Sequence, residues 1–89
     1  MPDYQQTRIY KIRGGDHIYI GGTTLTLGKR IANLHRDFKN GLGAPNIRSI
    51  MKYYNADIIL IENYPCTSRE ELNDRVRYWT AQIECINTI

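Results

Sequence analysis

The stretch that decides the fold runs from residue 7 to residue 22 and reads Thr7-Arg8-Ile9-Tyr10-Lys11-Ile12-Arg13-Gly14-Gly15-Asp16-His17-Ile18-Tyr19-Ile20-Gly21-Gly22. Before Gly14, residues that favour strands alternate with polar ones, and after Asp16 a second run is rich in Ile and Tyr. Glycine and aspartate between such runs are typical of a tight turn. The stretch therefore predicts a β-hairpin.

After this hairpin the apolar period changes to that of a helix. Apolar residues recur four, three and four positions apart, at Leu27, Ile31, Leu34 and Phe38. Thr26 is a suitable N-cap, and Asn40-Gly41 is a suitable end for this helix. Gly43-Ala44-Pro45-Asn46 then breaks the chain and opens a second, shorter helix, which we expect to stop near Tyr54-Asn55.

The last third of the chain predicts one more strand and one more helix. The continuous apolar run from Asp57 to Glu62 indicates a strand at the centre of a sheet or beneath helices. Ser68-x-x-Glu71 forms a capping box for the helix, with Thr67-x-x-Glu70 as a competing register. The buried stripe of this helix is then Leu72, Val76, Trp79 and Ile83.

Length and composition place the chain in a broad class. Its 89 residues are enough for one domain with a modest core, so we expect a single domain over residues 1–89. No apolar run approaches the roughly 18 residues of a membrane helix, and the first residues do not resemble a secretory signal. We therefore expect an intracellular protein without a membrane partner. In that setting Cys66 and Cys85 are expected to be free thiols, and they suggest no metal site.

Charge is distributed unevenly along the chain. Residues 1–52 carry nine Lys and Arg against three acids, whereas residues 53–89 carry three Arg against six acids. The predicted helical part of the basic half contains Lys29, Arg30, Arg36, Lys39, Arg48 and Lys52. Such a one-sided basic surface attracts polyanions, so these residues are candidates for nucleic-acid binding. The alternative is an ordinary solvated helical face.

The hairpin motifs and the following helix together resemble the GIY-YIG nuclease superfamily. Ile9-Tyr10 and Tyr19-Ile20-Gly21 correspond to its two motif strings, and Arg30 follows Gly21 by nine residues. Further similarity lies in Leu60-Ile61-Glu62, Cys66-Thr67-Ser68-Arg69-Glu70-Glu71-Leu72 and Glu84-Cys85-Ile86-Asn87. The resemblance implies an α/β (α+β) fold with a three-stranded antiparallel sheet flanked by helices, in the order β-β-α-α-β-α. It also implies a compact DNA endonuclease that uses Mg²⁺ or Mn²⁺. No separate DNA-binding module follows, so we expect weak or structural target selection.

The resemblance assigns roles to individual residues. Tyr10 and Tyr19 would position or deprotonate the attacking water, although a tyrosine with its usual pKa of about 10 needs a nearby cation to act as a base. Arg30 would bind the phosphate through its fork of donors. His35 stands five residues after Arg30 rather than four, so the two cannot both face one small site. We therefore expect His35 to lie at the surface or to contact phosphate. Asn87 would orient groups at the metal site or hold the last segment.

One position departs from the family pattern, because the metal-binding glutamate is replaced by Val76. Valine has no oxygen with which to bind Mg²⁺. The chain is then an engineered inactive form, a natural nuclease relative that binds nucleic acid without cutting, or an enzyme in which Glu62 or Glu71 substitutes as ligand. The expected function is a metal-dependent DNA endonuclease with impaired activity. The alternatives are a non-catalytic nucleic-acid-binding domain and a protein-interaction domain.

Overall fold

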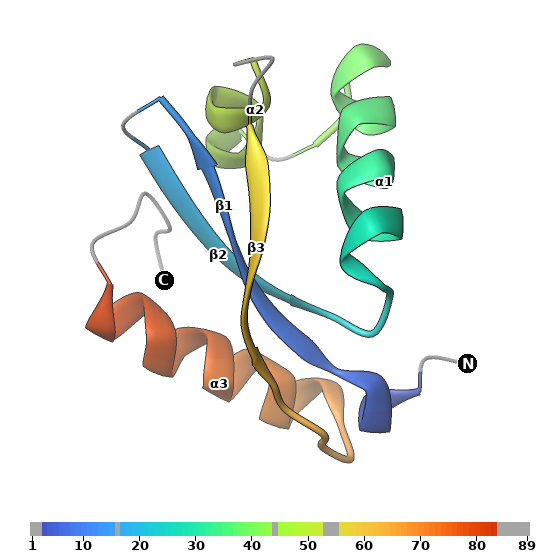
Figure 1. The fold of residues 1–89 in the computed structure, drawn as a ribbon, viewed down its shortest axis with the longest axis vertical. Coiled ribbons are helices and arrows are strands. Elements are labelled where there is room, and N and C mark those ends of the chain that lie inside the picture. Colours follow the sequence, from blue (N-terminus) through green and yellow to red (C-terminus); the bar gives the residue numbers. More distant parts are fainter. Residues whose placement is uncertain (1–2, 16, 44, 53–55, 84–89) are drawn as a thin grey trace.

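The computed structural model describes residues 3–15, 17–43, 45–52 and 56–83. Its strands and α-helices follow the predicted order β-β-α-α-β-α, which confirms the predicted fold class (Figure 1). They are β1 (Arg8–Gly14), β2 (His17–Thr23), α1 (Leu27–Lys39), α2 (Pro45–Met51), β3 (Asp57–Asn63) and α3 (Arg69–Gln82). A short 3₁₀ turn, η1 (Tyr4–Gln6), precedes them and was not among the predicted elements.

The three strands form one antiparallel sheet in the order β2-β1-β3. β1 and β2 are joined by a tight turn in which Gly15 has φ 59°, a left-handed conformation that favours glycine. Gly14 lies opposite His17 at the turn, and Tyr10 lies opposite Gly21 further along the hairpin. The predicted hairpin is therefore present, with β1 as the central strand of the sheet.

We expected residues 57–62 to form a strand at the centre of the sheet or beneath helices, and the central position is wrong. β3 pairs with β1 alone in the described sheet, and the Leu60 side chain is 43% exposed. Ile58 packs against the core, and α1 lies against part of β3. A continuous apolar run is therefore compatible with an edge strand here, because helices shield some of its residues and leave others open to solvent.

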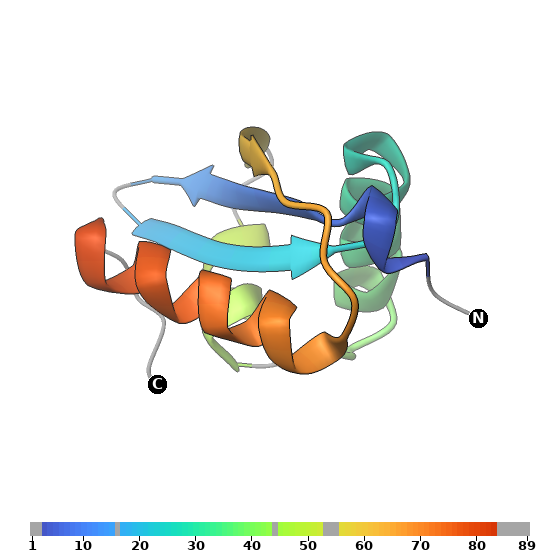
Figure 2. The same ribbon diagram turned by 90° about the horizontal axis from the view of Figure 1, so that it is seen from below.

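The two faces of the sheet are covered by different helices. On one face Tyr10 and Ile12 pack in a core with Leu34 of α1 and with Ile50 and Met51 of α2. α3 lies across the other face, as Figures 1 and 2 show from two directions. Neighbouring residues of a strand point to opposite faces. A residue of β2 therefore faces either α1 and α2 or α3.

The ends of the helices follow from local hydrogen bonds. The Thr26 hydroxyl accepts from the Lys29 amide at the start of α1, and the Ser68 hydroxyl accepts from the Glu71 amide at the start of α3. These bonds confirm the predicted Thr26 cap and select Ser68 over Thr67 as the cap of α3. The second helix ends at Met51, earlier than predicted. Tyr54 and Asn55, near which we expected its end, lie outside the described residues.

Candidate functional site

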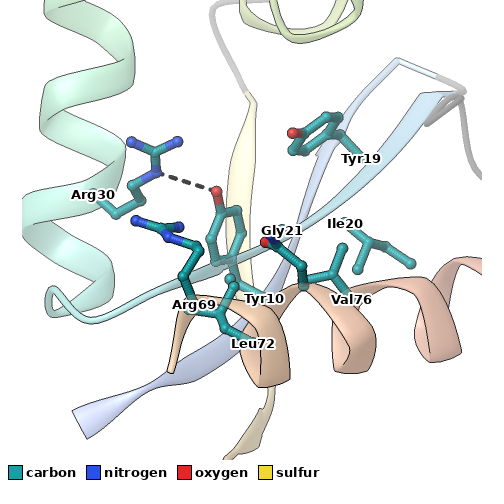
Figure 3. A pocket seen from close by; sticks show the side chains of 10 residues that line it. Tyr10, Tyr19, Ile20, Gly21, Arg30, Arg69, Leu72 and Val76 are labelled. Carbon is teal, nitrogen blue, oxygen red and sulfur yellow. Dashed lines mark hydrogen bonds between the residues drawn. The ribbon is translucent and has the colours of Figure 1, made fainter. Parts of the chain in front are cut away.

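A pocket of about 230 Å³ lies along the outer edge of β2, between the start of α1 and the first turns of α3 (Figure 3). Because β2 is an edge strand, residues from both faces of the sheet reach this pocket. β1 and β2 contribute Tyr10, Tyr19, Ile20, Gly21 and Gly22, whereas the helices contribute Arg30, Arg69, Leu72, Asn73 and Val76. The two motif tyrosines and the motif arginine therefore line one pocket.

Tyr10 and Arg30 are in direct contact in this pocket. The Arg30 Nε donates a hydrogen bond to the Tyr10 hydroxyl oxygen over 3.1 Å. Only 1% of Tyr10 is exposed, so its ring belongs to the core while its hydroxyl reaches the pocket wall. A Cβ on Gly21 would lie 2.6 Å from the Tyr10 hydroxyl oxygen. The glycine of the second motif is thus required because the Tyr10 ring lies directly over it, not because it needs a positive φ.

Tyr19 faces the same pocket with a half-buried ring. Burial raises the pKa of the Tyr19 hydroxyl above its usual value of 10.0, the neighbouring Tyr10 adds to the rise, and Arg30 partly opposes it. The hydroxyl therefore stays protonated at neutral pH. It is suited to donating a hydrogen bond to a water or a phosphate oxygen and poorly suited to removing a proton.

One face of α3 forms the lower wall of the pocket. Arg69, Leu72, Asn73 and Val76 are spaced by three, one and three residues, which places them on the same side of the helix. A Cβ on Gly22 would lie 2.5 Å from Leu72 Cδ2 and 3.3 Å from Val76 Cγ2, so α3 packs closely on β2 at this point. Val76 thus presents its methyl groups to the pocket where the family resemblance places a carboxylate.

The pocket lining does not provide the ligands of a Mg²⁺ or Mn²⁺ site. It contains two arginines, two tyrosines and an asparagine, but no aspartate, glutamate or histidine. Within the described part of the chain, no group of three or more His, Cys, Asp or Glu residues is placed to hold a metal ion. Mg²⁺ and Mn²⁺ prefer carboxylate oxygens, so the residues present do not fit such an ion.

Neither of the two carboxylates considered as substitutes lines the pocket. Glu62 receives hydrogen bonds from Arg75, and its Oε1 also accepts from the Trp79 ring nitrogen at 2.8 Å. The Arg75 hydrogen bonds are the main cause that lowers the pKa of Glu62, and the Trp79 bond contributes. Glu71 accepts a hydrogen bond from the Thr67 hydroxyl and is exposed. Each of these two carboxylates therefore already accepts hydrogen bonds from residues in or next to α3.

The remaining candidates lie away from the pocket or outside the described residues. His35 is exposed on α1 and does not line the pocket, in agreement with the helical spacing. Cys66 is a buried free thiol whose sulfur lies 3.4 Å from the Thr7 hydroxyl. Asn87 and Cys85 lie outside the described residues, so their predicted roles stay predictions.

The predicted nucleic-acid-binding residues fall into two groups. Lys29, Arg36, Lys39 and Lys52 are exposed on or next to α1 and α2, and Arg36 lies 3.7 Å from the Asp37 carboxylate. Arg48 has a structural role, because its Nη1 donates to the carbonyls of Phe38 and Leu42 and its guanidinium lies 4.8 Å from the centre of the Phe38 ring. DNA contacts from any of these five residues stay predictions.

Two pocket residues were missed in the sequence, Arg69 and Asn73. They precede Val76 by seven and three positions, so the helical period would have placed them beside it once Val76 was assigned to the site. Arg69 was treated only as part of the motif around the capping box. The pocket therefore contains a second arginine in addition to Arg30.

Comparisons of the chain with protein-family models, with curated proteins and with solved structures find no match. The resemblance to the GIY-YIG superfamily therefore rests on the motif residues alone. In the described residues, no helix is both long and apolar enough to cross a membrane.

Proposed function

We propose that this chain is a DNA endonuclease domain of the GIY-YIG type whose cleavage activity is impaired by Val76. The observation that carries this proposal is that Tyr10, Tyr19 and Arg30, which come from three different elements, line one pocket. Tyr10 and Arg30 are also joined by a hydrogen bond. If Tyr10 and Tyr19 only packed against each other across the hairpin, there would be no reason for Arg30 of α1 to reach the same pocket. The proposal includes that the protein acts on DNA inside the cell.

The side chains of the pocket suit a phosphodiester. An arginine guanidinium can bind two nonbridging phosphate oxygens with parallel hydrogen bonds, and Arg30 is held toward the pocket by Tyr10. The Tyr19 hydroxyl, kept protonated by burial, can donate to a phosphate oxygen or to a water. These residues bind and orient the diester, and Arg30 also stabilises the charge that develops during hydrolysis.

A divalent cation in nucleases neutralises charge on the reacting phosphate and activates water. The lining of this pocket does not fit such an ion, since Val76 replaces the carboxylate. This absence favours a second candidate function, a domain that binds DNA without cutting it. Both functions use the same pocket, and they differ in whether the domain cuts the DNA that it binds.

Nicking of supercoiled plasmid in Mg²⁺ tests the proposal. The chain should cut at least about a hundredfold more slowly than Val76→Glu, because lost electrostatic stabilisation of roughly 3 kcal/mol corresponds to that factor. Val76→Gln is the matched control, since glutamine is similar in size to glutamate but carries no charge. Its rate of nicking should stay as slow as that of the unmodified chain. If neither Val76→Glu nor Val76→Gln cuts the plasmid faster than the unmodified chain and all three stay slow, the endonuclease proposal fails. Salt-sensitive binding of DNA would then support the non-cutting alternative.

A further inference from the structure

Arg69 gives the pocket a second positive charge. It is the first residue of α3 and lines the pocket together with Arg30, which comes from α1. In Figure 3 the guanidinium groups of the two arginines lie on the same side of the Tyr10 ring. Two cationic forks from separate elements are therefore brought to one end of a small pocket.

The arginines of α3 differ in their partners. Arg75 is bonded to Glu62, and the Arg77 Nη1 lies 2.8 Å from Asp74 Oδ1. The Arg69 side chain has no hydrogen bond or ion pair with any described residue. Glu70 and Glu71 follow it on the helix, but neither lines the pocket. The Arg69 charge is thus not neutralised by a carboxylate in the pocket, so the site is suited to an anion.

We propose that this pocket binds one DNA phosphodiester between Arg30 and Arg69 without a divalent cation, which makes Arg69 a phosphate-binding residue. This inference rests on the proposed function, since it names how the same pocket holds DNA. Two guanidinium groups neutralise the phosphate oxygens, and Val76 keeps a competing negative charge out of the pocket. In this pocket the positive charge comes from two arginines, whereas in a metal-dependent nuclease site part of it comes from a metal ion.

Fluorescence anisotropy with a short labelled DNA duplex in EDTA tests the role of Arg69. Arg69→Ala should weaken binding about tenfold, since a hydrogen-bonded contact to a charged group is worth about 1.5 kcal/mol or more. Arg77→Ala is the matched control, because it removes the same charge from the same helix at a residue that does not line the pocket. It should weaken binding no more than about twofold. Arg69→Lys should recover part of the loss.

Circular dichroism melting of each variant establishes that the fold is intact, which we expect because Arg69 is exposed at the start of α3. Equal losses for Arg69→Ala and Arg77→Ala in folded protein would overturn the role of Arg69. If Arg69→Ala melts early, Arg69→Gln takes its place, because glutamine keeps a polar side chain at this position and removes the charge. Retention of full affinity by Arg69→Gln would likewise overturn the proposal.

The second measurement concerns the cation. At constant ionic strength, the chain should bind the duplex equally well, within about twofold, in EDTA and in Mg²⁺. Val76→Glu should bind about threefold more weakly or worse in EDTA, because its carboxylate repels the phosphate, and Mg²⁺ should restore the affinity. Binding by the unmodified chain that requires Mg²⁺ would overturn the proposal.

These outcomes separate the further inference from the proposed function. Rapid nicking by Val76→Glu together with equal binding by Arg69→Ala and Arg77→Ala would leave the nuclease assignment in place and reject only the two-arginine site. No binding of DNA by the unmodified chain at low salt would reject the further inference. Absence of nicking by Val76→Glu with an effect specific to Arg69 would reject the endonuclease and support the phosphate site.

Discussion

The Nε of Arg30 donates to the hydroxyl oxygen of Tyr10 over 3.1 Å, which joins the first turn of α1 to the middle of the central strand. The Arg30 side chain makes no other hydrogen bond with a described residue. Its two Nη groups are thus available to a ligand while its Nε holds the side chain in place (Figure 3). Tyr10 therefore acts as a positioning residue for Arg30 as well as a residue of the core.

The first prediction compares Arg30 and His35, the two residues of α1 that the family resemblance brings into question. In the Val76→Glu background, Arg30→Ala should lower plasmid nicking by about a hundredfold, since a charge that stabilises the reacting phosphate is lost. His35→Ala should change the rate less than about threefold, because His35 is exposed and does not line the pocket. Initial rates of nicking measure both effects. A larger loss for His35→Ala would mean that helical position does not decide which side chain reaches the phosphate.

The second prediction compares two glycines. Gly22→Ala should lower the free energy of unfolding by about 1–3 kcal/mol, because its Cβ would lie 2.5 Å from Leu72 Cδ2 and Leu72 is only 1% exposed. Gly28→Ala should raise it by about 0.5–1 kcal/mol, since a Cβ there meets nothing within 4 Å and alanine favours the helix. Urea unfolding of both variants checks the signs. Equal effects would mean that the contact between β2 and α3 is looser than described.

The third prediction concerns acid stability. The pKa of Glu62 is lowered from its ordinary value of 4.5, mainly by the Arg75 hydrogen bonds. The ionised carboxylate therefore stabilises the fold above pH 4.5, and this contribution is lost as the pH falls through the lowered pKa. Glu62→Gln should flatten the loss of stability in this acid range.

Asp74→Asn is the control for this experiment. Asp74 and its partner Arg77 have side chains that are 68% and 60% exposed, so their ion pair should add little to stability. Urea unfolding of the three proteins from neutral pH to below pH 4.5 makes the comparison. The same acid dependence in the unmodified chain and in Glu62→Gln would show that Glu62 is not responsible.

The fourth prediction separates binding from folding among the basic residues. The affinity of the chain for duplex DNA should fall with salt at a log–log slope of roughly −3.5 to −5.5, as expected for four to six phosphate contacts. Lys29→Ala should reduce the magnitude of this slope by about 0.9 without altering stability, because Lys29 is exposed. Anisotropy titrations at several salt concentrations give the slopes. A slope near zero would mean that the basic face is only solvated surface.

Arg48→Ala serves as the contrasting variant. It should lower the free energy of unfolding by about 1–3 kcal/mol, because it removes the bonds to the Phe38 and Leu42 carbonyls and the contact with the Phe38 ring. Thermal or urea unfolding measures the loss. Unchanged stability together with weakened DNA binding would return Arg48 to the nucleic-acid-binding group.

Local chemistry made the elements predictable from the sequence. The hydroxyls of Thr26 and Ser68 cap helices whose first turns lie within three residues of them, and the turn at Gly15 depends on the conformation of glycine itself. The order of strands and helices along the chain followed from the same local signals. The motif spacing also selected Tyr10, Tyr19 and Arg30, although their catalytic roles stay predictions.

The pairing of β1 with β3, which are far apart in the chain, could not be predicted from the sequence. Ile9 lies opposite Glu62 but Tyr10 lies opposite Leu60, so β3 contains one extra residue at a β-bulge. A shift of one residue changes the face to which a side chain points, and Glu62 lies against Arg75 and Trp79. The edge position of β3 and the approach of Arg69 to Arg30 depend likewise on how separate elements pack. The sequence by itself therefore determined the helices, the hairpin and the candidate residues, because short-range hydrogen bonds and periodicity act within a few residues. Only the tertiary structure decided the strand order, the partners of Glu62 and the second arginine of the pocket, because these arise from contacts between segments far apart in the chain.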